Sequence, residues 1–178
     1  MKRNRNCFTL VEILMVAGMI CLVAALIVVA YNGIYRSWAT GNTVAVMKGA
    51  HLALDRYMLE NGSYPEKTSQ AALEDVVAPG SKLALDLLQE CAPYSEKDAG
   101  GKVRVFDDFG KESAIRYIFP LKNTNSFGLI SAGKDGSFGN NDDIIYLPTG
   151  NGTLKPGFYT GKLDEGDGSI EDAEPIAQ

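Results

Sequence analysis

An uninterrupted apolar segment near the amino terminus constrains the fold of this chain more than any other feature. It runs for 23 residues from Phe8 to Ala30 and carries one charged side chain, Glu12. As an α-helix it would be about 34 Å long, enough to cross the roughly 30 Å hydrocarbon core of a bilayer. A buried core helix and a cleaved secretory signal are the competing interpretations, but both usually have shorter apolar segments. The sequence therefore favours a membrane-spanning helix.

The residues before this segment indicate its orientation. Residues 1–7 include three basic side chains and no acidic one. By the positive-inside rule this end stays in the cytoplasm, so the chain after Tyr31 is expected on the other side of the membrane. A carboxylate inside such a span costs a few kcal/mol unless it is neutralised or paired. Glu12 is therefore a candidate functional residue.

The same residues carry a resemblance to a known family. A short basic leader, the run Phe8-Thr9-Leu10-Val11-Glu12 and an unbroken apolar helix resemble the type IV pilins and pseudopilins. The resemblance implies that a prepilin peptidase cuts between Cys7 and Phe8 and methylates the new amino group of Phe8. It also implies that Glu12 pairs with the amino terminus of a neighbouring subunit, which offsets the burial of both charges. Cys7 departs from the family pattern, which nearly always has Gly before the cut.

The helical pattern continues beyond the apolar segment. Residues 31–60 contain no proline, and apolar residues recur there at helical spacing, at Val44, Met47 and Leu54. Asn61-Gly62 is a typical helix end. We therefore expect one helix over residues 8–61, whose first part (8–30) spans the membrane and whose amphipathic part (31–61) packs on a globular head. His51, the sole histidine, is expected to have a packing or surface role.

The remaining sequence predicts an α+β head over residues 62–147. Segments Ser69–Val77 and Ser81–Cys91 each begin with Ser and have apolar helical spacing, which predicts two short helices. Short β-branched and aromatic runs, separated by Gly, Asn and Asp, predict a small antiparallel sheet of three or four strands packed on the long helix. These runs cover residues 103–106, 114–119, 126–130 and 144–147.

A C-terminal extension, residues 148–178, follows the head. Its last fifteen residues, from Asp164 to Gln178, contain six acidic side chains and no basic one. Such a composition predicts a disordered tail from residue 164. Cys91 is the only cysteine beyond the apolar segment and is expected to be a buried free thiol, with intermolecular pairing as the alternative.

Residues 131–144 carry the one pattern with metal-binding chemistry. They contain three carboxylates, three glycines and two asparagines between two strand-like runs. Ca²⁺ prefers six to eight oxygen ligands, whereas Zn²⁺ favours the nitrogen and sulfur that this stretch lacks. The stretch is not an EF-hand, because the Glu at loop position 12 is missing. From the residues alone, a solvated Asx-rich turn remains the alternative.

This loop also resembles the calcium loop of the major pseudopilin of type II secretion, in its Ser-x-Gly-x-Asp-Gly start and its Asp-Asp-Ile end. The Asn-Gly-x-Tyr-Pro run at residues 61–65 resembles the end of the long helix in the same protein family. The resemblance implies a structural Ca²⁺ ion. Its side-chain ligands would be Asp135, Asp142 and Asp143, and its backbone ligands the carbonyl groups of Ala132 and Ser137.

Together these patterns predict a structural protein rather than an enzyme. The sequence offers no nucleophile–base pair, phosphate-cradling loop or second histidine, and its net charge of -5 argues against binding nucleic acid by bulk charge. The resemblance implies a pilin-like fold and a homo-oligomeric pseudopilus subunit for protein export. It would sit in the inner membrane with a periplasmic head, and its partners would be prepilin peptidase, other pseudopilins and the inner-membrane assembly platform. Two alternatives remain: a type IV pilin or minor pilin-like subunit for adhesion, motility or DNA uptake, and a membrane-anchored Ca²⁺-binding module that does not polymerise.

Overall fold

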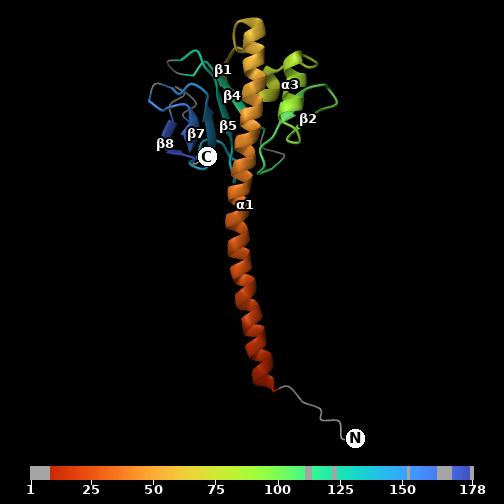
Figure 1. The fold of residues 1–178 in the computed structure, drawn as a ribbon, viewed down its shortest axis with the longest axis vertical. Coiled ribbons are helices and arrows are strands. Elements are labelled where there is room, and N and C mark those ends of the chain that lie inside the picture. Colours follow the sequence, from red (N-terminus) through yellow and green to blue (C-terminus); the bar gives the residue numbers. More distant parts are fainter. Residues whose placement is uncertain (1–8, 111–113, 122–123, 152, 164–169, 177–178) are drawn as a thin grey trace. The chain divides into compact units, whose positions relative to one another are not determined.

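The computed structural model describes residues 9–110, 114–121, 124–151, 153–163 and 170–176. The chain divides into two compact units, Met1–Trp38 and Ala39–Gln178. Helix α1 (Leu10–Asn61) contributes to both units, so that the expected long N-terminal helix is present (Figure 1).

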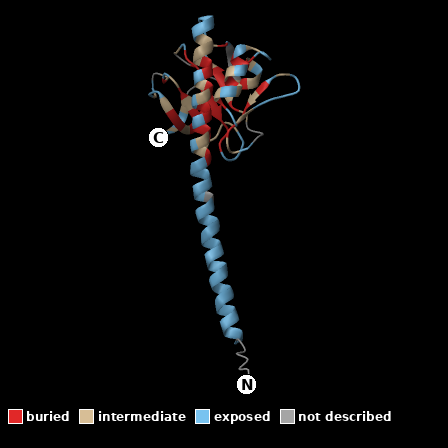
Figure 2. Ribbon diagram, turned by 45° about the vertical axis from the view of Figure 1, so that its right-hand side comes forward, coloured by how far each residue is buried: buried red, intermediate tan, exposed pale blue. Residues whose placement is uncertain are grey.

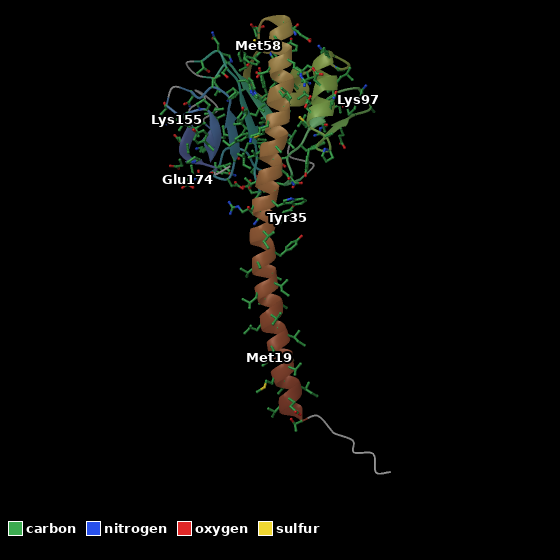
Figure 3. The ribbon with its side chains drawn as sticks, in the orientation of Figure 1. Met19, Tyr35, Met58, Lys97, Lys155 and Glu174 are labelled. Atoms are coloured by element: carbon green, nitrogen blue, oxygen red, sulfur yellow. The ribbon has the colours of Figure 1, made fainter. Side chains whose placement is uncertain are left out.

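The first unit consists, in its described part, of the beginning of α1. Every residue from Leu10 to Trp38 whose burial is described is exposed, and the helix is pale blue throughout this part in Figure 2. Its apolar side chains project outward all around the helix axis, Met19 among them (Figure 3). An 18-residue window of α1 has a mean hydropathy of 3.0 and is 0% buried. The helix is therefore long and apolar enough to span a membrane, and no described residue of its own unit covers it.

In the second unit the rest of α1 is amphipathic, as its spacing predicts. Met47, Ala50 and Leu54 are fully buried, which places one stripe of the helix against the head. Gly49 is required on this stripe, because a Cβ there would lie 2.4 Å from the carbonyl oxygen of Glu90. The backbone of α1 thus touches the end of α3 (Lys82–Glu90).

The head contains an antiparallel sheet of six described strands (Figure 1). In spatial order they are β1 (Lys67–Ala72), β4 (Arg116–Phe119), β5 (Gly128–Ser131), β6 (Ile144–Leu147), β7 (Gly157–Leu163) and β8 (Ile170–Pro175). A separate two-stranded ribbon pairs β2 (Ser95–Lys97) with β3 (Val103–Val105). The expectation of an antiparallel sheet is confirmed, and β4 to β6 fall on three of the four predicted runs. The fourth run, residues 103–106, forms β3, which pairs with β2 in the ribbon and is not part of the sheet.

Alternation along the strands gives the sheet two apolar faces. Tyr117 and Leu129 belong to the same apolar core as the buried stripe of α1. The next residues along these strands, Ile118 and Ile130, point to the opposite face and form a second cluster with residues of β6 and β7. Both faces being covered explains why the central strands β5 and β6 are nearly continuous apolar runs.

One of the two predicted short helices is wrong in most of its length. The segment Ser81–Cys91 forms α3, and the Ser81 hydroxyl accepts a hydrogen bond from the Ala84 amide at 3.2 Å, as an N-cap should. The segment Ser69–Val77 instead supplies most of β1 and only the four-residue helix α2 (Leu73–Val76). The physical reason is pairing, because β1 hydrogen-bonds to β4 at the edge of the sheet.

The acidic C-terminal segment also differs from its expectation. We expected three or four strands and disorder from residue 164, but β7 and β8 extend the sheet. β7 buries Phe158 and Leu163, and β8 pairs with it in antiparallel register from Ile170 to Pro175. Backbone pairing and the packing of Ile170 on the second cluster outweigh the acidic composition. Residues 164–169 and 177–178 of this segment lie outside the described residues.

Candidate functional site

The start of α1 holds the first group of predicted residues. The Glu12 carboxylate accepts hydrogen bonds from the Thr9 amide and the Thr9 hydroxyl, both at 3.0 Å. The Thr9 hydroxyl in turn accepts one from the Glu12 amide at 3.3 Å. This reciprocal pair is a capping box, which satisfies free donors at a helix start. The Thr-x-x-Glu spacing could have predicted it, whereas Cys7 and Phe8 lie outside the described residues.

The predicted calcium loop, residues 132–143, connects β5 to β6. At its centre the Asp142 carboxylate accepts hydrogen bonds from the amides of Lys134 at 3.0 Å and Asp135 at 3.3 Å. Gly133 has a φ of +62°, and a Cβ there would lie 2.2 Å from the Asp142 carbonyl oxygen. Only glycine fits at this position. The beginning and the end of the loop are thus in direct contact.

Asp135 and Ser137 lie on the exposed side of this loop. One carboxylate oxygen of Asp135 accepts from the Ser137 amide at 2.7 Å, and the other accepts from the Asn140 side-chain amide at 2.7 Å. The same Asn140 nitrogen donates to the Ser137 carbonyl at 2.8 Å. In this arrangement a neutral amide binds two oxygen atoms that the resemblance assigns to a cation.

Asp143 differs from the other two carboxylates because it is buried, with 1% of its surface exposed. Its Oδ2 accepts from the Gly139 amide at 2.7 Å, but its Oδ1 is buried and has no hydrogen-bond partner in the described part of the chain. Burial raises the pKa of this carboxyl to about 6, and the charges of Asp142 and Asp135 add to the rise. A buried acceptor without a donor is costly, and a proton or a cation on Asp143 would offset that cost.

The structure brings the five predicted metal-binding residues into one loop but does not close them around a single point. No group of three or more His, Cys, Asp or Glu side chains is placed to hold a metal within the described part of the chain. The atoms of this loop that could bind a metal are oxygen atoms, which suit a hard cation such as Ca²⁺. The unpartnered Oδ1 of Asp143 is one of them. Ala132 is fully buried at the beginning of the loop.

A buried carboxylate that the sequence does not single out lies next to this loop. Asp107 is 3% exposed and accepts a hydrogen bond from the Ser131 hydroxyl at 2.6 Å. Burial is the largest cause that raises the pKa of Asp107, and the bond from Ser131 opposes it. Asp107 and Ser131 are 24 residues apart, so no local pattern could have joined them.

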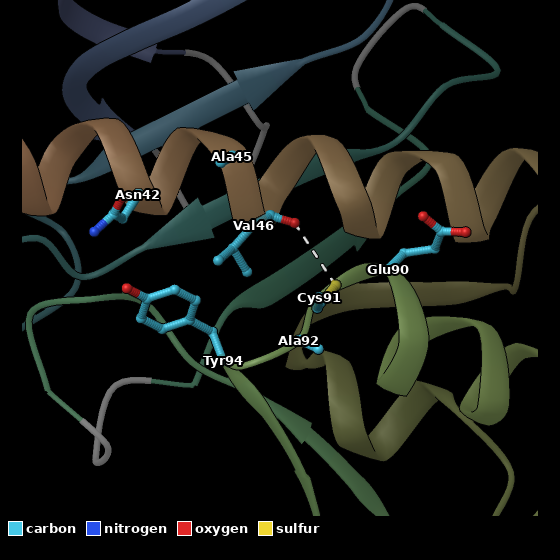
Figure 4. A pocket seen from close by; sticks show the side chains of 7 residues that line it. All are labelled: Asn42, Ala45, Val46, Glu90, Cys91, Ala92 and Tyr94. Carbon is cyan, nitrogen blue, oxygen red and sulfur yellow. Dashed lines mark hydrogen bonds between the residues drawn. The ribbon is translucent and has the colours of Figure 1, made fainter.

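The predicted buried thiol, Cys91, lines a small cavity of about 120 Å³ (Figure 4). Cys91 is buried and free, and its Sγ donates to the Val46 carbonyl at 3.7 Å. Burial raises the pKa of this thiol to about 12, so the reactive thiolate is scarce at neutral pH. The cavity therefore has no activated nucleophile.

His51 has the packing role expected from its sequence context. Its ring lies between Phe127, at a centroid distance of 5.7 Å, and Tyr146, at 5.5 Å. Its Nε2 is 3.3 Å from a carboxylate oxygen of Asp55, whose other oxygen accepts from the Tyr64 hydroxyl at 2.8 Å. These contacts tie α1 to the sheet.

Comparison with known proteins gives no relative for this chain. No protein-family model matches it, no curated protein matches it, and no solved structure matches it. Function is therefore inferred from the residues and from their geometry.

Proposed function

We propose that this chain is a pseudopilin, the structural subunit of a pseudopilus in a type II secretion system. A prepilin peptidase would cut between Cys7 and Phe8 and methylate Phe8. The mature chain would lie in the inner membrane with its head in the periplasm. There it would assemble into a filament with other pseudopilins and the inner-membrane assembly platform. A long N-terminal helix followed by an antiparallel sheet is compatible with the pilin-like fold that this proposal requires.

The observation that carries the proposal is the exposed apolar start of α1. Described side chains from Leu10 to Trp38 have no cover within their unit, and an apolar surface of this extent requires lipid or other apolar helices around it. A filament subunit would have each of these surroundings in turn, because its helix first lies in the lipid bilayer and then packs against the helices of neighbouring subunits. The run Phe8 to Glu12 at the beginning of this helix supports the same conclusion.

Glu12 would act in assembly through its charge. Within the described residues, the Glu12 carboxylate accepts hydrogen bonds from the amide and the hydroxyl of Thr9, and both groups are neutral. Cutting before Phe8 would create an ammonium group two residues from this start. A carboxylate in one subunit and an ammonium in the next would neutralise each other in a low-dielectric surrounding, which would set the axial register of the subunits.

The calcium loop would stabilise the head. Asp135, Asp142 and Asp143 would bind Ca²⁺ through side chains, and Ala132 and Ser137 through backbone carbonyls. The buried, unpartnered Oδ1 of Asp143 supports this assignment, because a cation would compensate it. When bound, the ion supplies charge neutralisation and loop closure rather than catalysis.

The capping box favours a second candidate function, a membrane-anchored Ca²⁺-binding module that does not polymerise. Thr9 gives the Glu12 carboxylate a partner inside its own chain. A purely local role for Glu12 would leave no need for a neighbouring subunit. The two candidates differ in whether the negative charge of Glu12 matters or only its ability to accept hydrogen bonds.

Glu12→Gln separates the two, because glutamine also completes a capping box but carries no charge. The full-length chain would be expressed with the prepilin peptidase and assembly platform, and filaments would be sheared off and sedimented. We expect Glu12→Gln to insert into the membrane normally and to lose assembly. Thr9→Ala, the matched control, removes the cap and keeps the charge, and it should still assemble. Normal assembly of Glu12→Gln would contradict the role of the Glu12 charge in assembly, whereas membrane insertion without filaments in both the wild type and Glu12→Gln would support the anchored module.

A further inference from the structure

We propose that Ser131 and Asp107 form a hydrogen-bonded relay between the calcium loop and helix α1, so that Ca²⁺ binding stabilises α1 around Asn42 and Thr43. This inference rests on the proposed calcium site and adds a mechanism by which that site acts on the rest of the head. All members of the relay belong to the second unit, Ala39–Gln178.

The relay begins at the first turn of the loop. The Ser131 hydroxyl, which is fully buried at the end of β5, accepts a hydrogen bond from the Gly133 amide at 3.2 Å. Gly133 is pressed against the carbonyl group of Asp142, and the following amide, that of Lys134, donates to the Asp142 carboxylate. A cation that fixes Asp142 therefore fixes Gly133, and with it the orientation of the Ser131 hydroxyl.

The next step is the buried carboxylate of Asp107. The Ser131 hydroxyl donates to Asp107 Oδ2 at 2.6 Å, a short distance typical of bonds to a charged acceptor. The other oxygen, Oδ1, accepts from the amides of Phe109 at 3.1 Å and Gly110 at 3.3 Å. The Asp107 carboxylate thus stabilises the turn formed by residues 107–110. Loss of the Ser131 bond would leave its buried Oδ2 without a donor.

The last step joins this turn to α1. The amide of Asp108 donates to the hydroxyl of Thr43 at 3.2 Å, and the Asp108 carboxylate accepts from the side-chain amide of Asn42 at 2.9 Å. Thr43 is 0% exposed, so its hydroxyl acts away from water. Because Asp107 and Asp108 are adjacent, a shift at the Ser131 bond moves the groups that bind α1.

The bonds from Gly133 through Ser131, Asp107 and Asp108 to α1 are buried or half-buried, whereas the bond between Lys134 and Asp142 at the loop end of the relay is exposed. Networks of this kind respond as a unit, since breaking one bond leaves the next group unsatisfied. Coupling between two sites is reciprocal in binding free energy. A change at Thr43 should therefore weaken Ca²⁺ binding in the same sense as a change at Ser131.

The test is a calorimetric titration of Ca²⁺ into the full-length chain in detergent, with Ser131→Ala as the perturbation. The chain offers a matched control in Ser126→Ala, because Ser126 is also buried but its hydroxyl has no hydrogen-bond partner among the described residues. We expect Ser131→Ala to weaken Ca²⁺ binding about tenfold or more, as loss of a bond to a charged group should. Ser126→Ala should change it by less than about twofold.

A second measurement reads the far end of the relay. Amide hydrogen exchange over residues 42–46 should slow on addition of Ca²⁺ in the wild type and in Ser126→Ala, and stay unchanged in Ser131→Ala. Should Ser131→Ala fail to fold, Thr43→Val replaces it: it keeps the side-chain shape, removes the acceptor of the Asp108 amide and should weaken Ca²⁺ binding several-fold.

Wild-type chain that binds Ca²⁺ with no change of exchange in α1 would overturn the relay and leave the calcium site standing. Equal Ca²⁺ affinity in Ser131→Ala and Ser126→Ala would also overturn the relay. Wild-type chain that takes up no Ca²⁺ would overturn the site and the relay together.

Discussion

The buried carboxylate of Asp143 gives the sharpest quantitative prediction, a dependence of stability on pH that Ca²⁺ reverses. Burial raises the pKa of this group from 3.8 to about 6, so the folded state binds a proton that the unfolded chain releases near pH 4. The rise corresponds to at most about 3 kcal/mol of differential stability. Without a cation, stability contributed by the protonated carboxyl is fully present below pH 3.8 and is lost as pH rises through about 6.

The assay is thermal unfolding of the full-length chain in detergent, in EGTA, from pH 4 to pH 8. The comparison is with Asp143→Asn, whose side chain does not titrate. Any fixed cost of the new amide is the same at every pH, so the difference in unfolding free energy between the two proteins isolates the carboxyl. We expect the wild type to lose stability relative to the variant between pH 4 and pH 7, and then to reach a plateau.

Saturating Ca²⁺ should reverse this trend for the wild type alone. Ca²⁺ competes with the proton for Asp143, so the rise in melting temperature on adding Ca²⁺ should grow as pH passes 6. At a Ca²⁺ concentration 100 times the Kd, the gain is about 2.7 kcal/mol. The reasoning about this group would be refuted if, in EGTA, the stability of the wild type relative to Asp143→Asn did not change with pH. It would also be refuted if the wild type gained stability relative to the variant toward pH 7.

Two further predictions concern the packing of the head. Gly49→Ala should clearly lower the melting temperature, because its Cβ would lie 2.4 Å from the Glu90 carbonyl oxygen. Gly41→Ala is the control: nothing lies within 4 Å of its Cβ, so it should stabilise the helix by up to about 1 kcal/mol. Equal melting temperatures of the two variants would contradict the close approach at Gly49. Cys91 should react with N-ethylmaleimide only slowly at pH 7.5 in the folded chain and rapidly in denaturant, as followed by mass spectrometry, since burial raises the pKa of its thiol to about 12; fast labelling of the folded chain would contradict its burial.

The parts of the fold that the sequence predicts are those with local signals. The amphipathic stripe with Met47 and Leu54, and the Ser81 cap of α3, are set by residues within a few positions of one another. β1 and β8 could not be predicted from local sequence, because their conformation depends on pairing with β4 and β7. For β8, pairing outweighs an acidic composition that is otherwise typical of disorder.

The candidate site divides in the same way. Asp135, Asp142 and Asp143 stand out in the sequence because they share one glycine-rich loop. The sequence does not show that Asp143 is the buried one, or that Asp107 bonds to Ser131 at the beginning of the loop. Both features depend on the tertiary structure. The capping box of Thr9 and Glu12 is a local signal, and its spacing could have indicated a second role for Glu12.

The central claim, that the chain is a processed filament subunit, is tested most directly by the mass of its amino-terminal peptide. The full-length chain would be expressed with a prepilin peptidase, purified from membranes and analysed by mass spectrometry. Our account predicts a chain that lacks residues 1–7 and begins with N-methylated Phe8. A membrane-bound chain that still begins at Met1 would contradict it and would favour the anchored module.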